Sequence, residues 1–520
     1  MKMKQIASAA AVVCGAFASQ AQAQTPTFGP YDTPDLKVFL TGATAPDNFL
    51  ASIAGQLFDS NGFYTFQDDN GTPTNFADDG RLYRAFYGTT KNDSTIPASL
   101  RAKKVLFVKR SKGGSVWGVN PVARAQRVAT LNMTASTCVL NTSIYRCAEK
   151  GIDPGLTGHG APTNAGEVSD FGVSDVEPAL FKAPFNVEFG QDQLTTAEVG
   201  RLDIKPANVL MMGFVATNSV PFTTHLSRGD YGSMLNGVVF DWKQVDPTIT
   251  TGNTQVVVCR RVNGSGTQTS YNWFFSNFPC QTAAGGSSAP ARMVDNSFGV
   301  VGGSGTPSDP VVIDPTAGYT VVENSTSGNV RDCLTRAQSN TDHTFVGDDG
   351  KTYQIKFSNS TLPFRAIGVL SLDSASSATS GTGTTAPTTG WSFRMLDGAG
   401  IFDARASSSG GQVVSHGPGT GLAPSKANLV DGRYDFAVEL TLQRRKVAVT
   451  NEHGDAVSVP TGLKLDFINE FIKRVGDPAF NTSTAVAALP PTYAPPTANV
   501  AFGTRNGNTC SPLQRLFPQP

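Results

Sequence analysis

One short run of residues carries the side-chain types that recognise a small anion. Residues 261–267 read Arg-Val-Asn-Gly-Ser-Gly-Thr and follow an apolar run, 255–259, that predicts a buried strand. A glycine-rich turn between a strand and a helix directs several backbone N–H groups to one point, where the helix N-terminus adds positive potential. Arg261 can add a charge-assisted contact, and the hydroxyls of Ser265 and Thr267 can add donors beside Gly266. An ordinary turn in which Ser265 caps a helix is the alternative interpretation.

Three further turns have a similar character. Residues 42–45 (Gly-Ala-Thr-Ala) follow a strand predicted over 36–40, and residues 111–114 (Ser-Lys-Gly-Gly) follow a strand predicted over 105–108. Asp175 lies in a third turn, where its carboxylate would repel a fully ionised anion but would accept a hydrogen bond from a ligand that retains a proton. If the strands are parallel, these turns lie at one edge of a sheet, where ligands bind.

The elements that must position these turns alternate between strand and helix. Apolar periodicity predicts a helix with Phe49, Leu50, Ile53, Leu57 and Phe58 on one face, a strand over 209–216, a helix over 226–242 and an amphipathic helix over 466–475. The polar stretch 59–104 and the Gly/Ser/Pro-rich segment 281–330 indicate insertions, and the Ser/Thr/Gly tract 373–390 indicates an exposed linker. This alternation predicts an α/β protein with parallel strands.

Composition excludes several classes of protein. The chain has 520 residues, with 41 basic and 41 acidic side chains, and only 16% of its residues are charged. A zero net charge argues against a polybasic nucleic-acid binder, and 39% hydrophobic residues are enough for a large core. The 53 glycines and 32 prolines indicate many loops. We therefore expect a loop-rich globular protein that binds no nucleic acid and has no transmembrane segment.

The N-terminus predicts export. Lys2 and Lys4 precede an apolar run over 6–17, and Ala21-Gln22-Ala23 matches the small-x-small pattern of a signal-peptide cleavage site. We expect cleavage after Ala23 and a periplasmic or secreted protein. The alternative is a lipoprotein signal at Cys14, which the large Val13 before it disfavours.

The cysteines fit this compartment. Outside the signal, six remain, an even number that predicts disulfides in an exported chain: Cys138, Cys147, Cys259, Cys280, Cys333 and Cys510. Fifteen pairings of six cysteines are possible. Proximity favours Cys138–Cys147 and Cys259–Cys280, which leaves Cys333–Cys510. No paired C-x-x-C spacing suggests a metal site.

Enzyme and cofactor motifs are missing from the sequence. The five histidines are scattered without an H-E-x-x-H pattern, and neither a G-x-S-x-G elbow nor a nucleotide phosphate loop occurs. We expect no catalytic residue, no metal and no cofactor.

The combined turns resemble the type II periplasmic solute-binding proteins, most closely the phosphate-binding subunit of phosphate ABC importers. The matching segments, in chain order over roughly residues 36–475, are 40–44, 111–114, 170–175, 231–237 with Trp242, 260–267 and 365–369. The Arg-x-x-Gly-Ser-Gly-Thr arrangement is the most specific of them. Pro46 follows Ala45 directly, where the family usually has an aromatic residue before the proline.

The resemblance implies an α/β fold of two lobes with mixed sheets, a hinge and long loop insertions, closing on an oxyanion. It implies lobe 1 over 24–215, lobe 2 over 216–364, and a return to lobe 1 with a proline-rich tail over 365–520. Carried over by motif, the ligand-binding residues are Thr44, Ala45, Ser111, Asp175, Arg261, Ser265, Gly266 and Thr267. The implied function is capture of phosphate or a related oxyanion, with a membrane subunit of an ABC importer as partner. The alternatives are a surface interaction protein that keeps the fold without ligand uptake and, less favoured, a secreted phosphate-handling hydrolase.

Overall fold

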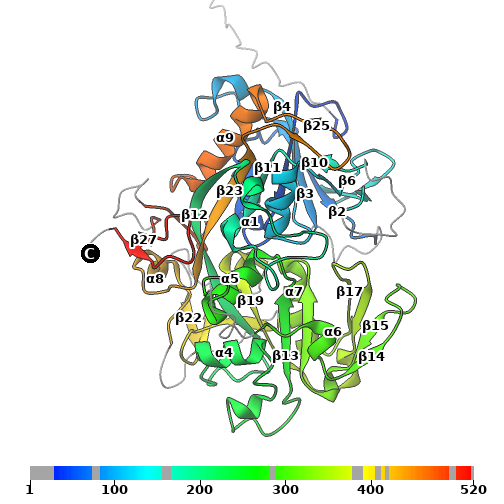
Figure 1. The fold of residues 1–520 in the computed structure, drawn as a ribbon, viewed down its shortest axis with the longest axis vertical. Helices are drawn as coiled ribbons and strands as arrows, with labels where there is room; N and C mark the ends of the chain where they lie inside the picture. Colours follow the sequence, from blue (N-terminus) through cyan, green and yellow to red (C-terminus); the bar gives the residue numbers. More distant parts are fainter. Residues whose placement is uncertain are drawn as a thin grey trace, which may run out of the picture.

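Two mixed sheets, joined by one long strand, organise the chain into two lobes (Figure 1). The computed structural model describes residues 29–72, 82–154, 165–281, 289–377, 390–403, 412–415, 421–490 and 499–516. The predicted signal peptide, most of the 373–390 tract and part of the proline-rich tail lie outside the described residues. The expected two-lobed α/β architecture with mixed sheets is confirmed.

The lobe 1 sheet places three predicted turns side by side. Strand β1 (Leu36–Gly42) runs parallel to β4 (Lys104–Arg110) and to β11 (Phe171–Ser174), so the turns that follow these strands share one edge. The remaining strands of this sheet are β23 (Ala437–Arg445), β3 (Tyr83–Thr89), β2 (Tyr64–Asp68), β8 (Ile144–Cys147), β7 (Cys138–Asn141) and β26 (Val486–Ala488).

Helices α1 (Asp47–Gly55) and α9 (Gly462–Gly476) contact each other in this lobe. The apolar face of α9 brings Phe471 to 5.0 Å and Phe467 to 5.4 Å, between ring centroids, from Phe107 of β4. Such aromatic packing stabilises the lobe core and holds β4 in place. Shorter helices in this lobe are α2 (Asn120–Arg124) and α3 (Thr196–Val199).

The lobe 2 sheet repeats the parallel arrangement. Strand β13 (Val256–Arg261) is parallel to β16 (Thr320–Asn324) and to β19 (Arg365–Ser371). Helix α7 (Ser327–Ser339), which follows β16, and α5 (Gly266–Ser276), which follows β13, both contact β13 and β19. The other elements of this lobe are α4 (Arg228–Leu235), α6 (Met293–Asn296), β20 (Trp391–Arg394), β21 (Ile401–Asp403), β22 (Gln412–Ser415), and a small sheet of β14 (Val300–Gly302), β15 (Val311–Ile313), β18 (Thr352–Ile355) and β17 (His343–Val346).

Strand β12 (Leu202–Thr217) connects the lobes. Its first part, up to Met211, pairs with β23 of lobe 1, and its last part, from Met212, pairs with β19 of lobe 2. Helix α8 (Lys426–Val430) lies on the later connection back to β23. Short two-stranded pairs complete the described elements: β5 (Arg127–Val128) with β10 (Glu167–Val168), β6 (Thr130–Leu131) with β9 (Glu149–Lys150), β24 (Val449–Thr450) with β25 (Ala456–Val457), and β27 (Gly503–Thr504) with β28 (Gln514–Arg515).

The structure corrects several expected boundaries. Strand β16 lies within the predicted insertion 281–330, yet it pairs with β13, and β2 and β3 within 59–104 join the lobe 1 sheet. Strands β19 and β20 pair with β12 in lobe 2, so lobe 2 extends beyond residue 364. The helix expected over 226–242 ends at Leu235, close to Gly237, whose φ of 73° is left-handed.

All six cysteines form disulfides, but two of the expected pairings are wrong. Cys138–Cys147 links the neighbouring strands β7 and β8, as proximity suggested. The others are Cys259–Cys333 and Cys280–Cys510, because α7 packs against β13 and brings Cys333 onto Cys259 within the core. Cys280, which follows α5, then pairs with the C-terminal segment.

No helix among the described residues is long and apolar enough to cross a membrane. The described part of the chain also contains no cluster of His, Cys, Asp or Glu side chains arranged to hold a metal ion.

Candidate functional site

The Arg261 guanidinium lies between the lobes at the end of β13. Only 2% of the residue is exposed, and burial lowers the pKa of its guanidinium while the negative charge of Asp175 opposes this effect. Its nitrogens donate to neutral oxygens: Thr44 Oγ1 (2.7 Å), Ser327 Oγ (3.3 Å), Gly113 O (3.2 Å), Ser325 O (2.5 Å) and Asn324 O (3.1 Å). Thr44 and Gly113 belong to lobe 1, whereas the other acceptors belong to lobe 2. A buried cation therefore bridges the lobes through neutral acceptors.

Helix α5 begins beside this arginine. Ser265 is its N-cap, and its Oγ accepts a hydrogen bond from the backbone N–H of Gln268 at 3.4 Å. The alternative interpretation of Ser265 as a helix cap is thus correct, and it leaves the anion interpretation of the turn open. A Cβ on Gly266 would lie 2.3 Å from Ser115 Oγ and 2.7 Å from Asp175 Cβ of the opposite lobe. The absence of a side chain here lets the helix N-terminus approach lobe 1 closely.

Asp175 meets α5 from lobe 1. Its Oδ2 accepts a hydrogen bond from Thr267 Oγ1 at 3.2 Å, while its buried Oδ1 has no hydrogen-bond partner among the described residues. Burial raises the pKa of Asp175 to about 6, although Arg261 lowers it. An unsatisfied buried acceptor is costly, and a hydroxyl on a bound ligand would satisfy it.

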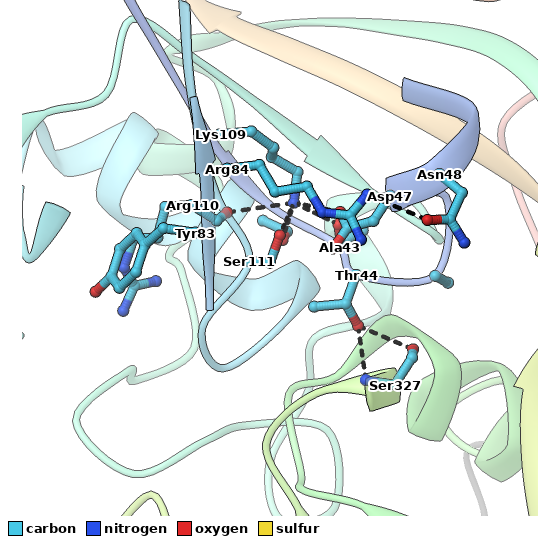
Figure 2. A network of polar contacts seen from close by, with 12 residues as sticks. Ala43, Thr44, Asp47, Asn48, Tyr83, Arg84, Lys109, Arg110, Ser111 and Ser327 are labelled. Atoms are coloured by element: carbon cyan, nitrogen blue, oxygen red, sulfur yellow. Dashed lines mark hydrogen bonds and ion pairs between the residues drawn. The ribbon is translucent and has the colours of Figure 1, made fainter. Parts of the chain in front are cut away.

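A second helix N-terminus in lobe 2 points at the same place. Helix α7 starts at Ser327 behind its N-cap Thr326, and the backbone N–H of Ser327 donates to Thr44 Oγ1 at 3.2 Å. The hydroxyl oxygens of Thr44 and Ser327 are 3.0 Å apart, and Figure 2 shows the two side chains facing each other. Two helix dipoles and Arg261 therefore supply positive potential at one point between the lobes.

Ser111 forms hydrogen bonds with Lys109 and Leu82, and not with the groups around Arg261 beside which it was expected. Its Oγ accepts from Lys109 Nζ at 2.7 Å (Figure 2), and its backbone N–H donates to Leu82 O at 2.7 Å. The short helix that follows this strand begins at Ser115. Ser115 Oγ accepts from the backbone N–H of Asp175 at 3.2 Å, so it is Ser115 that touches the Asp175 turn.

Lys109 organises the turn that carries Thr44. Its Nζ donates to Gly42 O at 3.0 Å and to Ala43 O at 2.7 Å, and it forms an ion pair of 2.9 Å with Asp47. Burial lowers the pKa of Lys109, and the charge of Asp47 partly restores it. These contacts fix the backbone immediately before Thr44.

The structure brings some of the expected site residues into contact with one another, but not all of them. Arg261 contacts Thr44 directly, Thr267 contacts Asp175, and Ser265 and Gly266 lie between them in the chain. Ala45 is buried beside Thr44, and its carbonyl accepts from Ser371 Oγ at 2.5 Å. Ser111 bonds to Lys109 instead.

Sequence reasoning missed Lys109, Ser115 and Ser327. Ser327 follows a strand and opens a helix, the same signal that identified residues 261–267, but it falls in a segment interpreted as an insertion. Buried Glu188 was also missed; it accepts from Trp117 Nε1 at 2.7 Å, and burial, with the nearby charge of Asp348, holds its pKa well above the usual range.

No family model and no curated protein matches the chain. Among solved structures, it is similar to a DING protein at 12% identity and a TM-score of 0.42, over 88% of this chain and 92% of that chain. It is also similar to a human phosphate-binding apolipoprotein (12% identity, TM-score 0.39, 86% and 90% coverage). A third similar structure is an ABC-type phosphate transport receptor from Vibrio cholerae (14% identity, TM-score 0.26, 59% and 74% coverage). The interpretation of the site rests on the contacts described above.

Proposed function

We propose that this chain captures phosphate or a related oxyanion between its two lobes. The ligand-binding groups in this proposal are seven of the eight residues expected from the sequence, with Ser115 and Ser327 added. The eighth, Ser111, has a supporting position. Three disulfides suit a protein that works in an oxidising compartment. In this proposal the protein delivers its bound oxyanion to the membrane subunit of an ABC importer.

One observation carries the proposal: Arg261 lies beside the N-termini of α5 and α7, and the neighbouring Asp175 has a buried Oδ1 without a hydrogen-bond partner among the described residues. The arginine and the helix N-termini attract an anion, and the free Oδ1 of Asp175 accepts a hydrogen bond from it. This pairing of donors with one acceptor suits an oxyanion that keeps a proton, such as hydrogen phosphate. Because the site residues are buried, entry requires the lobes to separate, and binding then favours the closed state.

Titration calorimetry with inorganic phosphate on the purified protein tests the proposal. The wild type should give saturable binding, and Arg261→Met should weaken it roughly 100-fold, because truncating a buried charge contact typically costs a few kcal/mol. Arg394→Met is the matched control. Arg394 is equally buried in lobe 2, and it donates to the carbonyl oxygens of Thr217, Val220 and Pro221.

We expect Arg394→Met to keep the affinity of the wild type for phosphate. Wild-type protein that melts cooperatively yet gives no saturable heat would overturn the proposal and favour the surface interaction protein. Steady release of phosphate from a phosphomonoester, surviving purification and lost in Arg261→Met, would favour the hydrolase instead.

A further inference from the structure

The C-terminal segment over residues 499–510, here called the strap, begins on lobe 1. Ala501 N–H donates to Ala488 O of β26 at 2.9 Å, which continues the lobe 1 sheet. Further along, Thr504 Oγ1 and the backbone N–H of Gly507 donate to the carboxylate of Glu439 on β23, each at 2.6 Å. Glu439 is itself buried, so these bonds fix the strap firmly to this lobe.

The next contact holds the turn that carries Asp175. The backbone N–H of Thr509 donates to Glu177 Oε1 at 2.7 Å, and the Thr509 hydroxyl donates to Glu177 Oε2. Both side chains are buried, and Glu177 lies two residues after Asp175. A buried carboxylate with two donors is a strong attachment, because losing either donor leaves a desolvated oxygen unpaired.

The strap then crosses to lobe 2. Cys510 is bonded to Cys280, which follows α5, and the guanidinium of Arg505 stacks 4.7 Å from the ring centroid of Trp273 in that helix. Figure 1 shows this red end of the chain beside β12, where the lobes are joined. The strap therefore contacts both lobes, and its link to lobe 2 is covalent.

Two adjacent residues are thus anchored to opposite lobes. The Cα atoms of Cys280 and Cys510 are 5.3 Å apart. A single peptide unit adds about 3.8 Å, which keeps Thr509 within roughly 9 Å of Cys280. The Asp175 turn and α5 can then separate only if the Thr509–Glu177 bonds break, or if the lobes pivot about this point.

We infer that the strap restrains lobe opening and makes this protein a retentive binder, one that exchanges its oxyanion slowly. This inference rests on the proposed function, since the restrained turn and helix carry Asp175 and Thr267. The restraint raises the free energy of the open state and of the path to it, and it leaves the ligand contacts of the closed state unchanged. The dissociation and association rates should therefore both be slowed, with little change in affinity.

The test compares Cys280→Ser/Cys510→Ser with Cys138→Ser/Cys147→Ser, which removes a disulfide confined to lobe 1. Each protein is loaded with radiolabelled phosphate and chased with excess unlabelled phosphate. We expect release at least tenfold faster without Cys280–Cys510, with Kd within about threefold of wild type, and unchanged release without Cys138–Cys147. Equal release rates in all three proteins would overturn the inference.

A second variant covers the case in which the double substitution misfolds. Thr509→Val keeps every cysteine but removes one donor to Glu177, and it should give release about threefold faster than wild type; a rate equal to wild type would count against the strap. Solution X-ray scattering of phosphate-free protein provides a readout independent of ligand. The radius of gyration should increase when Cys280–Cys510 is removed, even if phosphate does not bind, so failure of the proposed function and failure of the strap are distinguishable.

Discussion

Two buried cations, one in each lobe, lie on either side of Thr44 and differ in how their charge is balanced. Lys109 in lobe 1 has a carboxylate partner in Asp47 and several oxygen acceptors within reach (Figure 2). Arg261 in lobe 2 donates to neutral oxygens, and no carboxylate among the described residues forms an ion pair with it. Both side chains carry the desolvation penalty of a buried charge, but only one of them has that penalty offset by an opposite charge in contact.

Under the proposed function, this difference distinguishes a cation that stabilises the fold from a cation that binds the ligand. The Lys109 charge is balanced within the folded chain, so its role is to hold the backbone before Thr44. Arg261 feels the charge of nearby carboxylates such as Asp175 without an ion pair to any of them, so under the proposed function a bound anion would offset more of its burial penalty. Partner chemistry, and not burial alone, distinguishes the two sites.

The largest expected effect concerns the Lys109 pocket. Lys109→Met should lower the free energy of unfolding by about 3 kcal/mol, because it leaves the buried Oδ1 of the partly buried Asp47 carboxylate without its cation. Denaturant unfolding with and without phosphate measures this value. Saturation at about 100 times Kd should still stabilise this variant by about 2.7 kcal/mol, whereas the same phosphate concentration should hardly stabilise Arg261→Met. If phosphate stabilised Arg261→Met but hardly stabilised Lys109→Met, then Lys109 would be the cation that binds the ligand and Arg261 the one that supports the fold.

A smaller effect concerns the acceptor opposite Arg261. Asp175 has its pKa raised to about 6 by burial, so at pH 8 it is ionised and repels sulfate, which carries no proton. As the pH falls through about 6, the carboxyl gains a proton and becomes a donor. Sulfate affinity should therefore rise roughly tenfold between pH 8 and pH 5, measured by calorimetry.

Asp175→Asn provides the control for this pH dependence. Its amide cannot titrate, so the sulfate affinity of the variant should be higher at pH 8 and should change less with pH. Glu188 and Asp348, whose charges act on Arg261, also have raised pKa values. Their contribution to the pH dependence of sulfate affinity remains in the variant. A pH profile identical in wild type and variant would assign the effect to those groups instead of Asp175.

The sequence was sufficient for the elements that carry strong local signals. Apolar runs located β1, β4, β12 and β13, and the glycine-rich turns after them marked Thr44 and Arg261. What it could not supply was long-range pairing. Cys333 meets Cys259 because α7 packs on β13, and sequence proximity contains no information about that contact. Composition also misled, since the glycine and serine around β16 suggested a loop although the strand itself is β-branched and buried.

The position of Ser111 shows the same limit at the scale of a single turn, and it yields the smallest predicted effect. A strand ending at Arg110 and a helix starting at Ser115 leave four residues between them, and either serine could have been the helix start. The structure joins Ser111 to Lys109 and Ser115 to the Asp175 turn.

Ser111→Ala should therefore cost about 1 kcal/mol of stability, the value of one hydrogen bond, with phosphate affinity within about twofold of wild type. Ser115→Ala is the matched comparison and should weaken phosphate binding about fivefold, because it loosens the turn that holds the acceptor. Calorimetry measures the phosphate affinity of both variants. If Ser111→Ala weakens binding more than Ser115→Ala does, then Ser111 belongs to the ligand site, and the residues around Lys109 form part of that site instead of supporting it.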